Sequence, residues 1–457
     1  MSEVRLSEVR EFNEIFRYDA EYFNKYSVQL VKKIRDNKHC LIGEEFDVSK
    51  LAGFEFTEWF TPTNMESENY YIALTSKNIQ NERLELSDYI TIDKNVADLN
   101  LSRSKIYDGD VVLSYTGEYR RALTLQEKCA FQLGPNICRL RPKGRIVSSF
   151  YLSTFLNSKI GQTILDKEKT LSAQPTVAMS RIRLIPIPVL STDFQQKIET
   201  LVKSAHAKLA ESKSLYAQAE DTLLSELGLK DWQPKNEAVS IKTFSDFASS
   251  GRLDAEYYQS KYDELFEKLS KFDYKRLGDI VSVKKSVEPG SESYIDNGIP
   301  FIRVSDVTQF GIAETDLHLS AKEFSLESLR PHKDTILFSK DGSIGIAYKC
   351  EQDLDIITSG ALLHLDVKDS VLPDYLTLIL NSIIVKLLAE RDSNGAIIQH
   401  WKPDDIKRVI IPILPQDIQK QIAELIQRSF ALRQESKQLL ESAKLAVEQE
   451  IEGQQRR

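Results

Sequence analysis

The chain has 457 residues, of which 41% are hydrophobic and 28% charged, and its formal net charge is −8. A chain of this length is too long for one ordinary core, so we expect two to four domains of a soluble globular protein. The acidic balance disfavours nucleic-acid binding by the surface as a whole, although residues 101–145 concentrate nine basic against four acidic side chains.

The first ten residues, MSEVRLSEVR, are charged and lack the apolar region of a signal peptide. The most apolar long segment, residues 375–390, is interrupted by Asn381, Ser382 and Lys386 and is too short for a bilayer span, so we expect a buried amphipathic helix there. Four scattered cysteines without CxxC spacing favour reduced thiols and a cytoplasmic location: Cys40, Cys129, Cys138 and Cys350.

A heptapeptide occurs twice, as RYDAEYF at residues 17–23 and as RLDAEYY at residues 252–258. Apolar residues spaced three and four apart follow each copy, which predicts a helix with Asp19 or Asp254 at its N-cap and a glutamate in its first turn. General acid–base catalysis would need these carboxylates in a cleft with shifted pKa values. An exposed helix start offers neither, so we interpret the heptapeptide as structural.

The heptapeptides begin two copies of a longer pattern. YLSTFLNS at residues 151–158 matches YLTLILNS at residues 375–382, and from there the offset is constant at 224. Earlier segments match in the same order, YIALTSKNI with FIRVSDV and DGDVVLSYTG with HKDTILFSKDG. Because this period is much longer than that of solenoid repeats, we infer a duplicated domain.

Each copy predicts the same series of elements: a short helix, β-branched segments between turns, a second helix, a polar loop, a strand punctuated by prolines and a long helix. The fold class is therefore α+β, with a mixed or antiparallel sheet in each copy. The second helix, polar loop and strand are expected at residues 148–167, 170–180 and 184–190 of the first copy, and at 372–391, 392–405 and 409–415 of the second.

The long helices should begin near Asp193 and Asp417, whose carboxylates suit a helix N-terminus. The first should end near Leu227, before Gly228, and the second near Ile451. Residues that recur every seven positions predict that the helices pair as a coiled coil, and about 35 residues would make a spacer of roughly 50 Å. The expected interface combines a column of small or apolar residues with leucines: Ile198, Leu201, Ala205, Ser212, Leu215, Ala219, Ile422, Leu425, Ser429, Leu432, Ser436, Leu439 and Ala443.

Catalytic motifs are absent from the sequence. It has no GxxxxGK[ST], GxGxxG, GxSxG or HExxH motif, and its six histidines have no metal-ligand spacing. The segments PDYL and PDDIK weakly resemble nuclease motifs, but the first opens a predicted helix and the second precedes a predicted strand. We therefore expect a protein that is not an enzyme. A stand-alone nuclease and a coiled-coil scaffold that binds only protein are the alternatives.

Two diverged domains, each followed by a matched helix, suit a partner that has a two-fold repeat of its own. Double-stranded DNA is such a partner, because half-sites read from one face lie about one turn, or roughly 34 Å, apart. Divergence between the two copies would then give an asymmetric, bipartite target.

With these features the sequence resembles the specificity (S) subunit, HsdS, of type I restriction–modification systems. The resemblance covers essentially the whole chain and is carried by the two heptapeptides, by FIRVSDV and DTILFSKDGSIGIA, by the polar loop with Gly395, Ala396 and Gln399, and by the proline-containing strands before QQKIETL and IQKQIAEL. The first copy departs further from the pattern, since it lacks an equivalent of Arg303 and has SYTGEYRR in place of FSKDGSIG.

The resemblance implies a non-catalytic subunit in which two target recognition domains each read one part of a split DNA sequence and an antiparallel coiled coil sets their pseudo-two-fold spacing. It also implies two adenine methyltransferase (M) subunits docked on the coiled coil, with restriction (R) subunits joining through that assembly. S-adenosylmethionine would belong to M, ATP and Mg to R, and no cofactor to this chain. The implied segments are recognition domains at 1–190 and 236–414, with spacer helices at 191–235 and 415–457.

Loops at the tip of each recognition domain should present basic side chains to phosphates and polar side chains to base edges. For Arg303, which interrupts an apolar strand, structural pairing with Asp306 is an alternative. The candidates are Arg120, Arg121, Gln174 and Thr176, with Arg141 and Lys143 on phosphates, in the first copy, and Arg303, Ser305, Lys340, Ser343, Gln399, His400 and Lys402 in the second.

Overall fold

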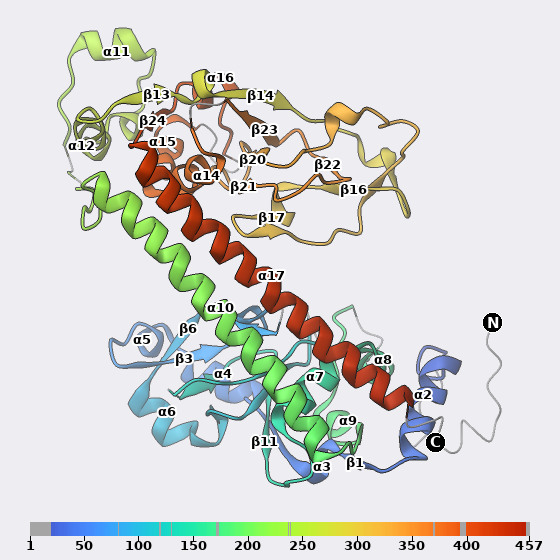
Figure 1. Cartoon of the computed structure of the whole chain (residues 1–457). Coiled ribbons are helices and arrows are strands. Elements are labelled where there is room, and N and C mark those ends of the chain that lie inside the picture. Colours follow the sequence, from blue (N-terminus) through green and yellow to red (C-terminus); the bar gives the residue numbers. More distant parts are fainter. Residues whose placement is uncertain are drawn as a thin grey trace. The chain divides into compact units, whose positions relative to one another are not determined.

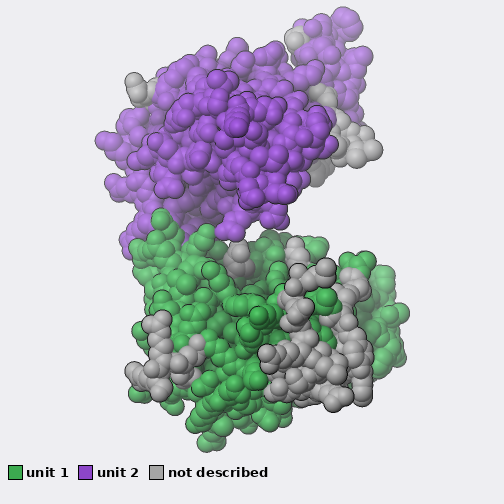
Figure 2. Space-filling model, turned by 90° about the vertical axis from the view of Figure 1, so that its right-hand side faces the viewer, with its two compact units in different colours: residues 1–209, 434–457 green, residues 210–433 purple. Residues whose placement is uncertain are grey.

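The computed structural model describes residues 20–80, 82–117, 120–128, 130–170, 173–235, 237, 239–368, 371–393 and 399–453. The chain divides into two compact units, which Figure 2 colours separately. Unit 1 comprises residues 1–209 and 434–457, and unit 2 comprises residues 210–433. Each unit thus holds one copy of the repeated domain and a part of each long helix. No helix in the described ranges is long and apolar enough to cross a membrane.

The described residues of unit 1 form two four-stranded sheets and two short strand pairs, and some of these strands, such as β3, β6 and β11, are labelled in Figure 1. One sheet is antiparallel, with the strand order β2 (Phe46–Lys50), β11 (Ile137–Pro142), β8 (Val111–Ser114), β9 (Ala122–Thr124). The other is mixed, because β3 and β10 are parallel, and has the order β6 (Ile90–Asp93), β3 (Tyr70–Leu74), β10 (Phe131–Leu133), β7 (Lys105–Ile106). The strand pairs are β1 (His39–Leu41) with β12 (Pro186–Pro188), and β4 (Ile79–Gln80) with β5 (Arg83–Leu84).

The helices described in unit 1 before the long helix are mostly short. They are α2 (Lys25–Arg35), α3 (Ile42–Glu45), α4 (Gly53–Trp59), α5 (Pro62–Met65), α6 (Lys94–Asn100), α7 (Ser149–Asn157), α8 (Lys159–Glu168) and α9 (Met179–Arg183), with 3₁₀ turns η1 (Ser76–Asn78) and η2 (Ser102–Ser104).

Unit 2 repeats this plan. Its antiparallel sheet has the order β14 (Val281–Lys285), β23 (Leu362–Val367), β20 (Ile336–Ser339), β21 (Ala347–Lys349). Its mixed sheet has the order β15 (Tyr294–Ile295), β19 (His318–Leu319), β16 (Ile299–Ile302), β22 (Ile357–Thr358), with β16 and β22 parallel. The strand pairs are β13 (Tyr274–Arg276) with β24 (Ile410–Pro412), and β17 (Val307–Thr308) with β18 (Gly311–Ile312).

The helices described in unit 2 before the second long helix include counterparts of α2, α3, α7, α8 and α9, but none of α4, α5 or α6. They are α11 (Phe244–Ser250), α12 (Ser260–Leu269), α13 (Leu277–Ile280), α14 (Pro373–Asn381), α15 (Ile383–Asp392) and α16 (Pro403–Lys407), with 3₁₀ turns η3 (Ala255–Tyr258), η4 (Ser291–Ser293), η5 (Val304–Asp306) and η6 (Glu327–Leu329). The α+β class and the mixed sheets agree with the sequence prediction.

The helix expected at 148–167 is two helices that meet at Ser158, and the equivalent helix of unit 2 breaks at Ser382. Ser158 has extended backbone angles, and its hydroxyl accepts the backbone N–H of Gly161, which starts α8. A Cβ atom on Gly161 would lie 2.0 Å from the carbonyl oxygen of Phe155, so only glycine fits this sharp turn. Because apolar residues recur at helical spacing on both sides of the break, it could not be predicted from the sequence.

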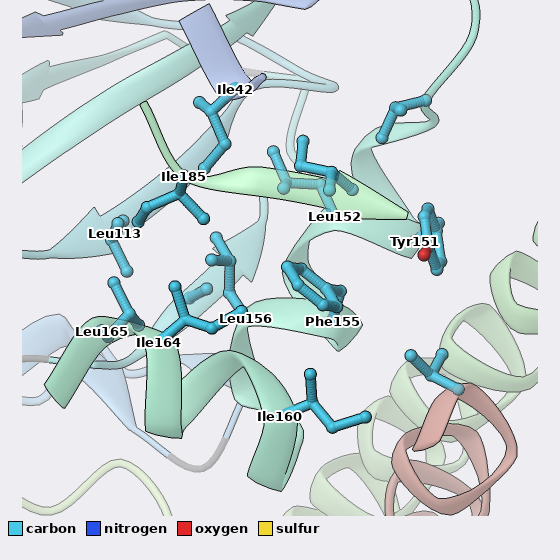
Figure 3. Close-up of a cluster of buried hydrophobic side chains, with 14 of the residues drawn as sticks. Ile42, Leu113, Tyr151, Leu152, Phe155, Leu156, Ile160, Ile164, Leu165 and Ile185 are labelled. Carbon is cyan, nitrogen blue, oxygen red and sulfur yellow. The ribbon is translucent and has the colours of Figure 1, made fainter. Parts of the chain in front are cut away.

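One core of unit 1 forms where α7 and α8 pack on β8, β12 and α3 (Figure 3). Tyr151 lies in this core with its side chain fully buried, and its hydroxyl donates to the carbonyl oxygen of Pro188 at 2.8 Å. The same contact occurs in unit 2, where the hydroxyl of Tyr375 donates to the carbonyl oxygen of Pro412 at 2.9 Å. Residues that are related by the constant offset therefore make the same contact in both units.

The side-chain capping predicted for the heptapeptide acids is not found where it can be checked. Asp19 lies outside the described residues, and α2 is capped instead by Asn24, whose side chain accepts two backbone N–H groups. In unit 2, Asp254 stands at the N-cap position of η3 with Glu256 in the first turn, as predicted, but α12 begins only at Ser260. The carboxylate of Asp254 makes no capping hydrogen bond and pairs instead with the guanidinium of Arg252 at 2.5 Å. An arginine two positions away competes for the carboxylate, and a charge-assisted pair outweighs a neutral cap.

The tyrosines of the heptapeptides, rather than the acids, make a contact that recurs in both units. The ammonium of Lys167, at the end of α8, lies 3.2 Å from the ring centre of Tyr22. In unit 2 the equivalent position, at the end of α15, is Arg391, whose guanidinium lies 5.0 Å from the ring centre of Tyr257. Each heptapeptide thus places an aromatic ring beneath a cation where the second helix ends.

The long helices are α10 (Thr192–Glu226) and α17 (Gln416–Gly453). The helix α10 begins one residue before the predicted cap Asp193, because the hydroxyl of Ser191 accepts the N–H of Phe194. Gly228 follows its end with a φ of +63°, as expected of a helix stop.

The long helices pack as an antiparallel coiled coil. In unit 1 the start of α10, including Ile198, clusters with the end of α17, including Ala443. In unit 2 the end of α10, including Ala219, clusters with the start of α17, including Ile422. The eight residues of the small or apolar column are all buried: Ile198, Ala205, Ser212, Ala219, Ile422, Ser429, Ser436 and Ala443.

The leucine column lies nearer the edge of the helix pair. Leu215 and Leu432 are buried, whereas Leu201, Leu425 and Leu439 are half-buried. A second buried column with the same seven-residue spacing accompanies the first one, and it consists of Val202, Leu209, Tyr216, Leu223, Ile426, Leu440 and Val447. Mixed aliphatic and aromatic residues made this column less visible in the sequence than the leucines.

Candidate nucleic-acid interface

In unit 2 the loop that follows β20 meets the segment that precedes α16. Residues Asp341 and His400 form a β-bridge, the N–H of Gly342 donates to the carbonyl oxygen of Gln399 at 3.0 Å, and the N–H of Trp401 donates to the carbonyl oxygen of Lys340 at 2.8 Å. We call these two segments, residues 340–343 and 399–402, the unit 2 tip. Backbone hydrogen bonds hold both segments in one surface, so their side chains act together.

The side chains of the unit 2 tip form a compact charged group. Nδ1 of His400 lies 2.9 Å from a carboxylate oxygen of Asp341, and the ammonium of Lys340 contacts the other oxygen. Trp401 is 1% exposed and packs on Phe338 of β20, which anchors the segment. The exposed imidazole of His400 therefore has a fixed partner on one side and solvent on the other.

In unit 1 the equivalent two segments also meet, but their side chains differ. Thr116 and Thr176 form a β-bridge, their hydroxyl oxygens lie 2.6 Å apart, and the N–H of Val177 donates to the carbonyl oxygen of Tyr115 at 2.8 Å. Gly117 has a φ of +69°, and the amide of exposed Gln174 lies next to it. We call residues 114–117 and 173–177 the unit 1 tip.

The two tips are equivalent in position. Thr176 and His400 are related by the constant offset between the copies, and each bridges to a residue just after an equivalent strand. The bridge joins two hydroxyls in unit 1 and a carboxylate and an imidazole in unit 2. One backbone arrangement thus presents two different sets of donors and acceptors.

Comparison with known proteins finds a family model that matches part of the chain. Residues 270–442, which include the whole unit 2 tip, match the family model described as type I restriction modification DNA specificity domain. The match covers most of the second copy of the repeated domain and part of α17.

Among solved structures, the chain is similar to the S subunit of a type I restriction-modification system from M. genitalium, at 13% identity and a TM-score of 0.42, over 91% of this chain and 94% of that one. It is also similar to the HsdS subunit from Thermoanaerobacter tengcongensis, at 15% identity and a TM-score of 0.30, over 90% and 95% of the two chains. A comparison with curated proteins gives no match. The similarity to a specificity domain is therefore a sequence match of residues 270–442 alone.

Two further residues proposed for the specificity domain of unit 2, Arg303 and Ser305, lie on the η5 turn after β16. The strand ends at Ile302, so exposed Arg303 does not interrupt it as predicted from the sequence. The N–H of Arg303 donates to the carboxylate of Asp306 at 2.8 Å, while its guanidinium lies 3.7 Å from the same oxygen. The turn itself is a repeated feature, since Asn78 accepts the N–H of Thr75 at 2.9 Å in unit 1.

Arg120 and Arg121, which follow the first segment of the unit 1 tip, have protein partners. Arg120 has a φ of +79°, and its guanidinium pairs with the carboxylate of Asp166 at 2.6 Å. The guanidinium of Arg121 lies 3.4 Å from the carbonyl oxygen of Ile79. Both side chains are half-buried, so a phosphate would compete with these contacts for them.

Arg141 and Lys143 are not brought together with the tip. Strand β11 is antiparallel to β8, with Ile137 opposite Ser114, so the end of β11 lies at the other end of the sheet. There Arg141 makes two hydrogen bonds to the carboxylate of Asp110, at 2.9 and 2.7 Å, and this pairing raises the pKa of Arg141. A bidentate pair of this kind is structural.

Sequence reasoning missed Thr116 and Asp341, the bridge partners within each tip. Both stand in the matched segments DGDVVLSYTG and HKDTILFSKDG, directly before a glycine with positive φ. That glycine was the available signal, because a left-handed turn after a buried strand often places its neighbours at the surface. The described residues contain no group of three or more acidic, histidine or cysteine side chains that could hold a metal ion.

Proposed function

We propose that the chain reads an asymmetric, bipartite DNA site, with one unit for each half-site, as the specificity subunit of a type I restriction–modification complex. The observation that carries this proposal is the pair of tips, which share a backbone arrangement and differ at the bridging side chains, Thr116 with Thr176 and Asp341 with His400. Hydroxyl, imidazole and carboxylate groups favour different base edges, so the two tips suit different half-sites.

The proposed contacts lie on or beside the tips, where most side chains are exposed or half-buried and Lys340 is buried. In unit 1 they are Gln174, Thr176, Arg120 and Arg121; in unit 2 they are Ser343, Gln399, His400 and Lys402, with Lys340 at the edge of the group. Arg303 and Ser305 on the η5 turn would extend the unit 2 contact. We assign Arg141 to its ion pair with Asp110 and leave Arg141 and Lys143 outside the tip contacts.

The long helices are the proposed spacer and docking site. A helix of 35 residues, as in α10, measures roughly 50 Å, which exceeds one turn of B-DNA. We propose that two methyltransferase (M) subunits dock on the helix pair, that restriction (R) subunits join through them and that the complex works in the cytoplasm. By function, the chain then divides into recognition domains at 1–190 and 236–414 and spacers at 191–235 and 415–457.

Mapping of methylated adenines in host DNA, with and without this gene, tests the proposal. We expect one split sequence to lose methylation in the deletion strain. Purified chain with M subunits should bind that sequence with a steep salt dependence, since neutralised phosphates release counterions. Binding that ignores sequence and salt would indicate a protein-only scaffold, and DNA cleavage or methylation by the isolated chain would indicate an enzyme.

A further inference from the structure

Each unit contains a short hairpin that touches the long helices. In unit 1 it is β4–β5, with Glu82 as the last residue of its turn, and in unit 2 it is β17–β18, with Phe310 in the same place. The registers agree, since Gln80 pairs with Arg83 and Thr308 with Gly311. Glu82 and Phe310 are therefore equivalent positions of the two copies.

The hairpin of unit 1 meets the helices through polar groups. The carboxylate of Glu82 lies 3.0 Å from the ammonium of Lys444 on α17, and its carbonyl oxygen lies 2.9 Å from Nε2 of His206 on α10. The side chains of Glu82 and Lys444 are only 14% and 19% exposed. Glu441 shares the ammonium at 2.6 Å, so Lys444 serves two carboxylates.

The hairpin of unit 2 meets the helices through aromatic groups. The ring of Phe310 contacts Tyr216 of α10 edge to face, with centres 5.0 Å apart, and lies 6.3 Å from the ring of Phe430 on α17. The guanidinium of Arg433 lies 3.6 Å from the centre of the same ring. Burial of apolar surface and a cation–π contact hold this hairpin.

The two contacts occupy the same place on the repeated helices. His206 of α10 and Phe430 of α17 are related by the constant offset between the copies, and each touches the turn residue of its hairpin. The position of the contact has been kept in both copies while its chemistry differs. Salt weakens an ion pair, although less when the pair is partly buried, and does not weaken apolar contacts, so the two attachments respond differently to ionic strength.

We propose that each hairpin attaches the recognition domain of its unit to the long helices. The contact is ionic and salt-sensitive in unit 1, and aromatic and less sensitive to salt in unit 2. The attachment sets the position from which each tip meets its half-site, and this second step rests on the proposed function. Recognition by unit 1 should therefore weaken with rising salt beyond the loss that phosphate screening causes in both units.

Hydrogen exchange of the full-length chain tests the attachment without DNA. In Lys444→Met, we expect the amides of β4 and β5 to exchange about tenfold faster, as for the loss of a partly buried ion pair, while β17 and β18 stay unchanged. In Phe310→Ala the pattern should reverse. Raising salt from about 0.05 to 0.5 M should accelerate exchange about threefold in β4 and β5 of the wild type only.

The matched control is Lys437→Met, which removes an exposed ammonium from the same helix. Unchanged exchange of β4 and β5 in Lys444→Met, or an equal salt response of both hairpins, would overturn the attachment. Adenine methylation by the complex with M subunits is measured alongside. Absence of any sequence-selective methylation by the wild type would refute the proposed function and would leave the exchange result to decide the attachment.

Discussion

Ser212 of α10 and Ser429 of α17 share a hydrogen bond of 2.9 Å between their hydroxyls, and the hydroxyl of Ser429 also donates to the carbonyl oxygen of Ser212 at 2.8 Å. Both side chains are fully buried. A side chain that reaches the backbone of the facing helix requires the two helices to approach closely. Small residues in the same buried column, such as Ala205, Ser436 and Ala443, leave space for such an approach.

Ser212→Leu should destabilise the helix pair by about 1–3 kcal/mol, because the larger side chain has no space at the seam. Ser212→Ala should cost less than about 1 kcal/mol, since Ser429 keeps the carbonyl oxygen as its acceptor. Urea unfolding followed by circular dichroism measures both. Ala217→Leu, on the exposed side of the same helix, is the control. An equal loss in Ser212→Leu and Ala217→Leu would contradict close packing at Ser212.

His400→Ala should alter recognition of one half-site and Thr176→Ala that of the other. Loss of one base contact costs roughly 1–3 kcal/mol, which corresponds to about a tenfold to hundredfold change in discrimination at one position. Competition methylation with single-base variants of the target, in the complex with M subunits, measures the change. The prediction fails if both substitutions relax the same half-site.

His364 should make unit 2 less stable in acid. Its ring is buried in β23 with Nε2 2.8 Å from the hydroxyl of Thr358, and burial lowers the pKa of His364 to about 4. The unfolded chain takes up this proton near pH 6.5, so the contribution is fully present above pH 6.5 and is lost as the pH falls toward 4. Between pH 7.5 and 5 the loss should be about 2 kcal/mol.

The measurement is the urea midpoint of the unit 2 transition at both pH values. His364→Gln should show a smaller difference between pH 7.5 and 5 than the wild type, because the variant has no group that takes up the proton. Identical differences in the two proteins would show that His364 is not the group that titrates.

Lys349 forms ion pairs with three carboxylates of unit 2. Its ammonium lies 2.9 Å from Asp374, 3.2 Å from Glu351 and 3.6 Å from Asp334, and its side chain is 7% exposed. Lys349→Met should cost roughly 2–4 kcal/mol, because it leaves a nearly buried Asp374 carboxylate without its cation; the other two carboxylates are partly exposed and add less. Thermal unfolding, with exposed Lys322→Met as the control, checks this. A loss no larger than that of Lys322→Met would argue against the ion-pair cluster.

The heptapeptides show which features of this protein could be predicted from local sequence and which could not. Their recurrence revealed the duplication, and the duplication led to the family, but their acids were given the wrong role. Asp254 binds Arg252 instead of a helix end, and the recurring contact is made by Tyr22 with Lys167 and by Tyr257 with Arg391. Those cations stand far from the rings along the chain, at the other end of the repeated domain, so no local pattern could pair them.

The tips show the same limit. The sequence placed Gln174, Thr176, Gln399 and His400 in polar loops, which the structure confirms as exposed or half-buried segments. Their partners across the tip, Thr116 and Asp341, stand in a separate segment much earlier in each copy. Arg141 seemed a phosphate contact because it is basic, yet the register of β11 with β8 puts it at the far end of the sheet.

The sequence by itself determined the duplicated α+β domain, the paired long helices and the absence of catalytic motifs, because periodicity and repeated letters are local properties that one chain displays directly. Only the tertiary structure decided which side chains meet: Glu82 with Lys444, Phe310 with Tyr216, Asp341 with His400. Such meetings depend on strand register and on packing between segments distant in sequence. Two copies with one fold can therefore attach their hairpins by an ion pair in one case and by edge-to-face and tilted aromatic contacts in the other.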